Sequence, residues 1–81
     1  MGIEYKIKFA VPINYDSASL LRKLPSPIDR HSRTEIYNYA IEADGFYFVD
    51  NLGDRNVAAV ALRSLLDEAL RFSHTVELTE L

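Results

Sequence analysis

The sequence predicts a single α+β domain whose elements follow the order β-α-β-β-α-β. Three observations lead to this prediction. Segments near both ends alternate apolar and polar residues, an Asp-Gly pair separates two strand-like segments in the middle, and two stretches space their apolar residues as helices do. The chain has 81 residues, which suits one domain, and we take residues 1–81 as that domain.

The first predicted strand covers residues 4–11. Apolar and polar side chains alternate there with the period of two that a strand with one buried face requires. The side chains expected on the buried face are those of Tyr5, Ile7, Phe9 and Val11. Pro12 ends the strand.

A short helix is predicted next. Asp16 or Ser17 can cap its first turn, because a short side-chain oxygen accepts from the free N–H groups there. The helix runs to Leu24, and Pro25 stops it because proline has no backbone donor and disfavours the helical conformation of the residue before it. Residues 25–34 contain two prolines and no periodicity, so they predict a loop.

Two further strands, residues 35–43 and 46–50, are predicted to form a hairpin around Asp44-Gly45. An Asp-Gly pair is a strong hairpin signal because a primed turn needs positive φ at its central residues. With that pair as the loop, the facing pairs are Ala43 with Phe46, Ile41 with Phe48, and Tyr39 with Asp50. The more apolar face, expected in the core, carries Tyr37, Tyr39, Ile41, Ala43, Phe46 and Phe48.

Residues 55–73 predict a second helix with Asp54 as its N-cap. Its apolar arc spans about 180°, wider than the roughly 100° that covering a sheet requires. At the far edge of this arc, Leu66 and Leu70 either pack on the first helix or stay exposed for a partner. The positions left for solvent are Arg63, Asp67, Glu68 and Arg71. Residues 75–81 alternate again and predict the fourth strand.

This element order suits the ferredoxin-like split β-α-β arrangement, given that β-α-β crossovers are right-handed. The arrangement has a four-stranded antiparallel sheet in the order 4-1-3-2, with two helices on one face. Proteins of many functions share it, so the fold does not name a function.

Composition and charge further restrict the class of protein. The net charge is −3 and 48% of the residues are hydrophobic, as in an ordinary globular domain. There is no apolar run near the roughly 20 residues of a membrane span, and the chain does not begin like a secretory signal, so we expect no membrane association. The absence of cysteine excludes disulfides, cysteine-bound zinc and thiol catalysis. We expect a cytoplasmic protein.

Charge is unevenly distributed along the chain. Residues 1–33 carry six Lys or Arg against three Asp or Glu, whereas residues 34–81 carry three against nine. Salt bridges between the two halves would explain this pattern. A basic patch opposed to an acidic one would also explain it, and would serve self-association, an anionic ligand or a basic protein partner.

The sheet face left open by the helices is a candidate interface. Its more apolar half is expected to carry Ile36, Ala40, Tyr47 and Val49. A contiguous apolar patch marks contact with a second copy or another protein, although scattered surface apolar residues are also ordinary. Nucleic acid is not expected, because Tyr47 is the one aromatic residue on this face and the chain is acidic.

The predicted loop offers the best candidate for chemistry. Arg30, His31 and Arg33 could hold a phosphate or carboxylate, because Arg donates in a bidentate fork and His titrates near neutral pH. Glu35 could then act as a proton-transfer partner. The plain alternative is a solvated loop whose charges pair with Asp29 and Glu35.

No other catalytic or metal motif is present. His31 and His74 lack the spacing of metal ligands, and there is no phosphate-binding or nucleophile motif, so we expect no metal and no cofactor. A chain this short is marginal without staples or oligomerisation. The sequence therefore favours a small, non-catalytic binding or regulatory protein that acts through protein–protein contacts as a homodimer. The alternative is a small enzyme or anion-binding protein that uses Arg30, His31 and Arg33.

Overall fold

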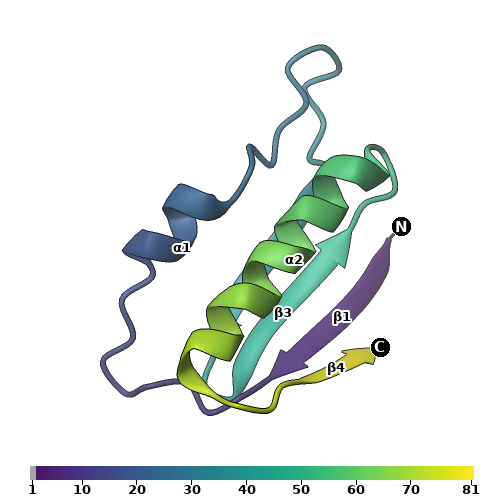
Figure 1. Cartoon of the computed structure of the whole chain (residues 1–81). Coiled ribbons are helices and arrows are strands. Elements are labelled where there is room, and N and C mark those ends of the chain that lie inside the picture. Colours follow the sequence, from purple (N-terminus) through teal and green to yellow (C-terminus); the bar gives the residue numbers. More distant parts are fainter. Residues whose placement is uncertain (1) are drawn as a thin grey trace.

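A computed structural model describes residues 2–81. Its elements are β1 (Ile3–Lys8), α1 (Ala18–Lys23), β2 (Tyr37–Glu42), β3 (Gly45–Asp50), α2 (Arg55–Phe72) and β4 (Glu77–Glu80). The element order predicted from the sequence is confirmed (Figure 1).

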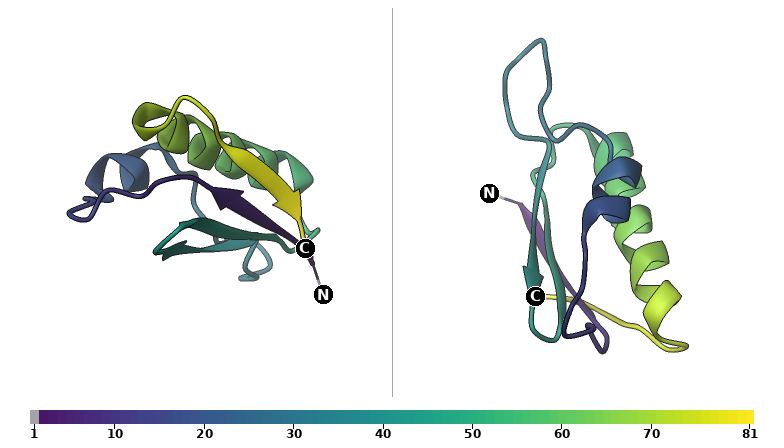
Figure 2. Two further views of the ribbon diagram at one scale, coloured as in Figure 1. Left: turned by 90° about the horizontal axis from the view of Figure 1, so that it is seen from below. Right: turned by 90° about the vertical axis from the view of Figure 1, so that its left-hand side faces the viewer.

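The four strands form one antiparallel sheet in the order β2-β3-β1-β4. This is the predicted order read from the opposite edge. β1 and β3 are the central strands, and β2 and β4 are the edges. Both helices lie on the same side of the sheet (Figure 2), where α2 packs on β3 and β1 while α1 packs mainly on α2.

The core lies between the central strands and α2. β1 buries Ile7, which lies between the half-buried Lys6 and the exposed Lys8, as the predicted alternation requires. Aromatic rings fill much of the layer: the Phe9 and Phe46 ring centroids are 4.9 Å apart, and the Tyr37 and Phe48 rings are stacked at 5.6 Å. The residues of α2 that are buried against them are Ala58, Ala61, Leu65, Glu68 and Ala69. Three of these five are alanines, and their small side chains let the helix lie close to the aromatic rings.

The hairpin register differs from the prediction by two residues. The structure pairs Glu42 with Gly45, so the turn is Ala43-Asp44 instead of Asp44-Gly45, and Ile41 faces Phe46. A slip of two residues preserves the face of every side chain, because the side-chain period of a strand is two. The hairpin side chains therefore point to the predicted faces. The prediction is wrong at the turn end of the core face, where Ile41 is 43% exposed and Ala43 lies exposed in the turn.

Gly45 has a different role from the one the turn motif suggested. It is the first residue of β3, it is buried, and its φ is +150°. A Cβ atom on Gly45 would lie 1.9 Å from the carbonyl oxygen of Ile7 in β1. The glycine is needed because β1 approaches the start of β3 closely at this position.

The structure corrects the prediction that Ile36 lies on the open face of the sheet. It is only 6% exposed and belongs to the core. β2 begins at Tyr37. The Ile36 carbonyl still accepts from the Asn51 N–H at 3.1 Å, but the Ile36 N–H donates to the Pro27 carbonyl of the loop at 2.6 Å. The alternation counted from residue 35 therefore does not apply to Ile36, which the loop covers.

The N-terminus of α2 is capped as predicted. The Asp54 carboxylate accepts from the backbone N–H of Val57 at 3.1 Å. We expect Asp54→Ala to lower the free energy of unfolding by about 1 kcal/mol, because the half-buried Val57 N–H loses its acceptor. Urea unfolding of both proteins measures this change. Asp54→Asn is the control, since asparagine caps about as well as aspartate, and a loss as large as that of the alanine variant would contradict the capping role.

Candidate functional site

The predicted loop projects beyond the end of the helix layer (Figure 1). Its turn is organised by Asp29, whose backbone N–H donates to the Thr34 carbonyl at 2.9 Å and whose carbonyl accepts from the Arg33 N–H at 2.7 Å. The Asp29 carboxylate also accepts from the backbone N–H of His31 at 2.9 Å. Backbone donation by His31 and Ser32 holds the pKa of the Asp29 carboxyl below its ordinary value.

The three basic residues of the loop are exposed and do not line the cavities described below. Arg30, His31 and Arg33 make no side-chain hydrogen bond or ion pair with any residue from 2 to 81. Glu35, the suggested proton-transfer partner, accepts instead from the Asn38 side chain. The structure thus places these residues on one short turn without a wall around them, and anion binding there stays a prediction.

A buried polar cluster joins the two helices, and the sequence did not predict it. Glu68 of α2 is fully buried. Its carboxylate accepts from the Tyr15 hydroxyl at 2.6 Å and from Arg71 Nη1 at 2.8 Å. Ser19 Oγ and Lys23 Nζ of α1 lie 3.4 and 3.5 Å from the same carboxylate. We call these five residues the Glu68 cluster.

The electrostatics of the Glu68 cluster suit a clamp better than a catalyst. Burial alone would raise the pKa of the Glu68 carboxyl, but hydrogen bonds from Tyr15 and Arg71 outweigh burial, and the pKa is lowered. Burial and donation to Glu68 raise the pKa of the Tyr15 hydroxyl. A carboxylate that holds its charge this firmly is a poor general base near neutral pH. The cluster ties α1, which buries only Leu20 of its own residues, to α2.

The prediction that Glu68 faces solvent is wrong. The signal was present in the spacing, because Glu68 lies seven residues after Ala61 and four before Phe72 and so shares their side of the helix. The error arose because every charged residue of the helix was assigned to the solvent-facing side, Glu68 included. The partners Tyr15, Ser19 and Lys23 come from the connection before α1 and from α1 itself, which helical spacing within α2 cannot reveal.

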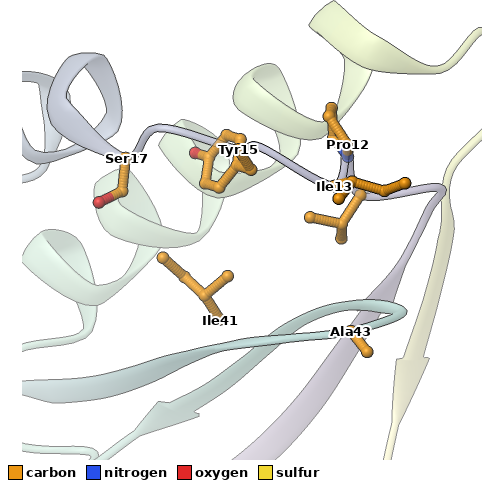
Figure 3. Close-up of a pocket in the computed structure, with 7 residues that line it drawn as sticks. Pro12, Ile13, Tyr15, Ser17, Ile41 and Ala43 are labelled. Atoms are coloured by element: carbon orange, nitrogen blue, oxygen red, sulfur yellow. The ribbon is translucent and has the colours of Figure 1, made fainter.

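Two cavities flank Tyr15. The larger has a volume of about 420 Å³ and lies between the β1–α1 connection and the end of β2 (Figure 3). Its lining is mostly apolar and includes Val11, Ile13 and Ile41. The smaller, about 320 Å³, is lined by polar groups that include Arg22 and Arg71.

The open face of the sheet is mostly polar. Lys6 forms ion pairs with Glu42 and, at 2.6 Å, with Asp44, and the Tyr47 hydroxyl donates to Glu4. The interface residues predicted on this face have different exposures: Ala40 is exposed, Tyr47 and Val49 are half-buried, and Ile36 is buried in the core. The remaining apolar residues are interrupted by these charged pairs.

The exposed flank of α2 carries three leucines four residues apart: Leu62, Leu66 and Leu70. We call them the α2 strip. Leu66 is two residues from Glu68 and so points to the opposite flank from the one that contacts α1. Leu62 and Leu66 are half-buried and Leu70 is 52% exposed.

Other site classes find no support in the described part of the chain. No helix within residues 2–81 is long and apolar enough to cross a membrane. The same residues contain no group of three or more acidic or histidine side chains placed to hold a metal ion. Comparison of the chain with protein-family models, with curated proteins and with solved structures gives no match in any of the three.

Proposed function

We propose that this chain is a non-catalytic protein-binding module that forms a homodimer through the α2 strip. The observation that supports this proposal is the row of Leu62, Leu66 and Leu70 on the flank of α2 that α1 leaves free, with Leu70 half exposed. Leucines at a spacing of four form one ridge on a helix surface, which is the unit of helix–helix packing.

A second copy of the chain fits this ridge by symmetry. The ridge is centred on Leu66, with one leucine four residues before it and one four residues after it. In an antiparallel pair of α2 helices, Leu66 therefore meets Leu66 of the second copy, and Leu62 meets Leu70. Two-fold dimers require this kind of self-complementary patch.

The exposed surface of the chain also supports association. The accessible surface is 5457 Å², whereas a folded monomer of this mass would expose roughly 4900 Å². Stable interfaces remove about 800 Å² from each partner. Burying the α2 strip and its surroundings would bring the protein back toward the ordinary relation between surface and mass.

The α2 strip is a better interface than the open face of the sheet. Contact through the open face would take the ion pairs of Lys6 with Glu42 and Asp44 out of water, and desolvating charges costs several kcal/mol per ion. The three leucines of the α2 strip are themselves uncharged, and the neighbouring ion pair of Arg63 with Asp67 is well exposed, so it can stay at the solvated rim of the contact. We also propose that the fold is of the ferredoxin-like kind, which the β-α-β-β-α-β order and the sheet order support.

Leu70→Glu tests the dimer. We expect the unchanged protein to sediment at twice the monomer mass at about 100 μM, and the variant to sediment as a monomer, because a charge introduced into the apolar contact between Leu70 and Leu62 of the second copy is desolvated. Sedimentation equilibrium measures both, with circular dichroism to show that the variant is folded.

Leu21→Glu is the matched control, because Leu21 is a similarly exposed leucine (57%, against 52% for Leu70) on α1. It should leave the dimer intact. A monomeric unchanged protein would refute the homodimer. A Leu70→Glu variant that still dimerises would refute the α2 strip as its interface.

A further inference from the structure

We propose that the outer edge of β2 binds an extended peptide of alternating apolar and basic residues, which adds to the sheet as a fifth strand. One apolar side chain of the peptide occupies the cavity beside Ile41. This surface is separate from the α2 strip, so the proposal does not depend on the homodimer.

The backbone of β2 has free hydrogen-bonding groups along its outer edge. β2 pairs with β3 on one side and has no strand on the other. The Ile36 carbonyl accepts from the Asn51 N–H, and this fixes the alternation of the antiparallel ladder. It follows that Tyr37, Tyr39 and Ile41 direct their N–H and C=O groups away from β3.

The loop pairs with the chain just before β2, through Ile28 and Glu35, but the rest of the edge of β2 lacks the sequence devices that normally block pairing. Native edge strands are protected by lysine, proline, a bulge or a very short length. β2 has six residues with the sequence Tyr-Asn-Tyr-Ala-Ile-Glu, with neither proline nor a basic residue. The opposite edge, β4, has four residues and is acidic at both ends. The edge of β2 is therefore the more open template for an added strand.

The cavity lies where the side chain of an added strand would point. Directly paired residues of neighbouring strands place their side chains on the same face. The peptide residue opposite Ile41 would thus point to the helix side, where Ile41 faces the β1–α1 connection across the cavity of about 420 Å³ (Figure 3). Ile13 and Ile41 are 102% and 43% exposed, so this apolar lining has no cover of its own.

The acidic residues near the end of β2 indicate which side chains the peptide should carry at every second position. These residues would lie on the open face, beside Asn38, Ala40 and Glu42. Glu42 and Asp44 both form ion pairs with Lys6, so Glu42, the last residue of β2, shares its cation with a second carboxylate. Lys or Arg at the alternate positions of the peptide would match this charge, and backbone pairing would supply the affinity common to strand addition.

A synthetic peptide tests the proposal. The probe has seven residues, alternates Lys with Val and Leu, is blocked at both ends and carries a fluorophore. We expect saturable binding by fluorescence anisotropy, and slower hydrogen exchange at the Tyr39 and Ile41 amides on binding. A probe N-methylated at alternate backbone nitrogens has the same side chains but lacks strand-pairing donors, so it should bind about tenfold or more weakly.

Matched variants locate the site. Ile41→Ser should weaken binding about tenfold by removing an apolar wall of the cavity, whereas Ile28→Ser should not, although Ile28 is equally exposed at 44%. Leu70→Glu should bind the probe normally, which separates this proposal from the homodimer. The proposal is overturned by no binding up to about 1 mM, by equal binding of the N-methylated probe, or by unchanged binding to Ile41→Ser.

Discussion

Gly45→Ala is expected to destabilise the protein by about 3–5 kcal/mol, which would leave little of the stability of a domain this size. The added Cβ would lie 1.9 Å from the Ile7 carbonyl oxygen and 2.9 Å from its carbonyl carbon. Both are backbone atoms of a central strand, so relief requires β1 to move away from β3. The φ of +150° adds strain for any residue with a side chain.

Gly53→Ala is the matched control for this substitution. A Cβ at Gly53 would have no neighbour within 4 Å, and the residue does not need positive φ. Its stability should stay within about 0.5 kcal/mol of the unchanged protein or rise slightly, because alanine restricts the unfolded chain. Urea unfolding followed by circular dichroism compares the three proteins. A Gly45→Ala variant as stable as Gly53→Ala would disprove the close approach of β1 to β3.

Glu68→Ala is expected to lower the free energy of unfolding by about 2–4 kcal/mol. The substitution leaves the Tyr15 hydroxyl without its acceptor and opens a space in a fully buried position. Lys23 and Arg71 are partly exposed and regain water, which limits the loss. Glu68→Gln keeps the volume and one acceptor oxygen, so it should cost less than the alanine variant.

The effect of Glu68 should depend on pH. Its pKa is lower in the folded protein than the ordinary 4.5, so the carboxylate stabilises the fold above that value, and the stabilisation is lost as pH falls through the folded pKa. The stability gap between the unchanged protein and Glu68→Gln should be widest near neutral pH and should close below about pH 4. Urea unfolding across this range measures the gap. A gap that is constant with pH would show that the Glu68 charge does not hold the helices.

The strand pattern made most of the fold predictable. Alternation placed Ile7 and Phe9 on the core face of the first strand, and the hairpin faces were right although the register was not. The error arose because Gly45 was read as a turn residue. Its actual constraint is the nearness of Ile7, a contact between segments far apart in the chain, which no local motif can show.

The candidate sites were less predictable, for a related reason. Leu66 and Leu70 lie on one helix, so helical spacing predicted two alternatives for them. The flank of α2 that faces α1 carries Glu68 instead of these leucines, and their contact with a partner stays a prediction. The cavity beside Ile41 forms where the β1–α1 connection comes near the edge of β2. The size of this cavity depends on the distance between α1 and the sheet. Packing between elements sets that distance, so the sequence of one segment does not predict it.

The position of β1 also bears on how fast the protein can fold. The β2–β3 hairpin and α2 use partners close in the chain and can form early. β1 pairs only with β3 and β4, which lie far from it in the chain: Lys8 pairs with Gly45 and with Glu77. Bringing such distant segments together costs loop-closure entropy before any contact repays it. We therefore expect docking of β1 to be the slow step of folding, before which the β2–β3 hairpin would present both of its edges to other chains.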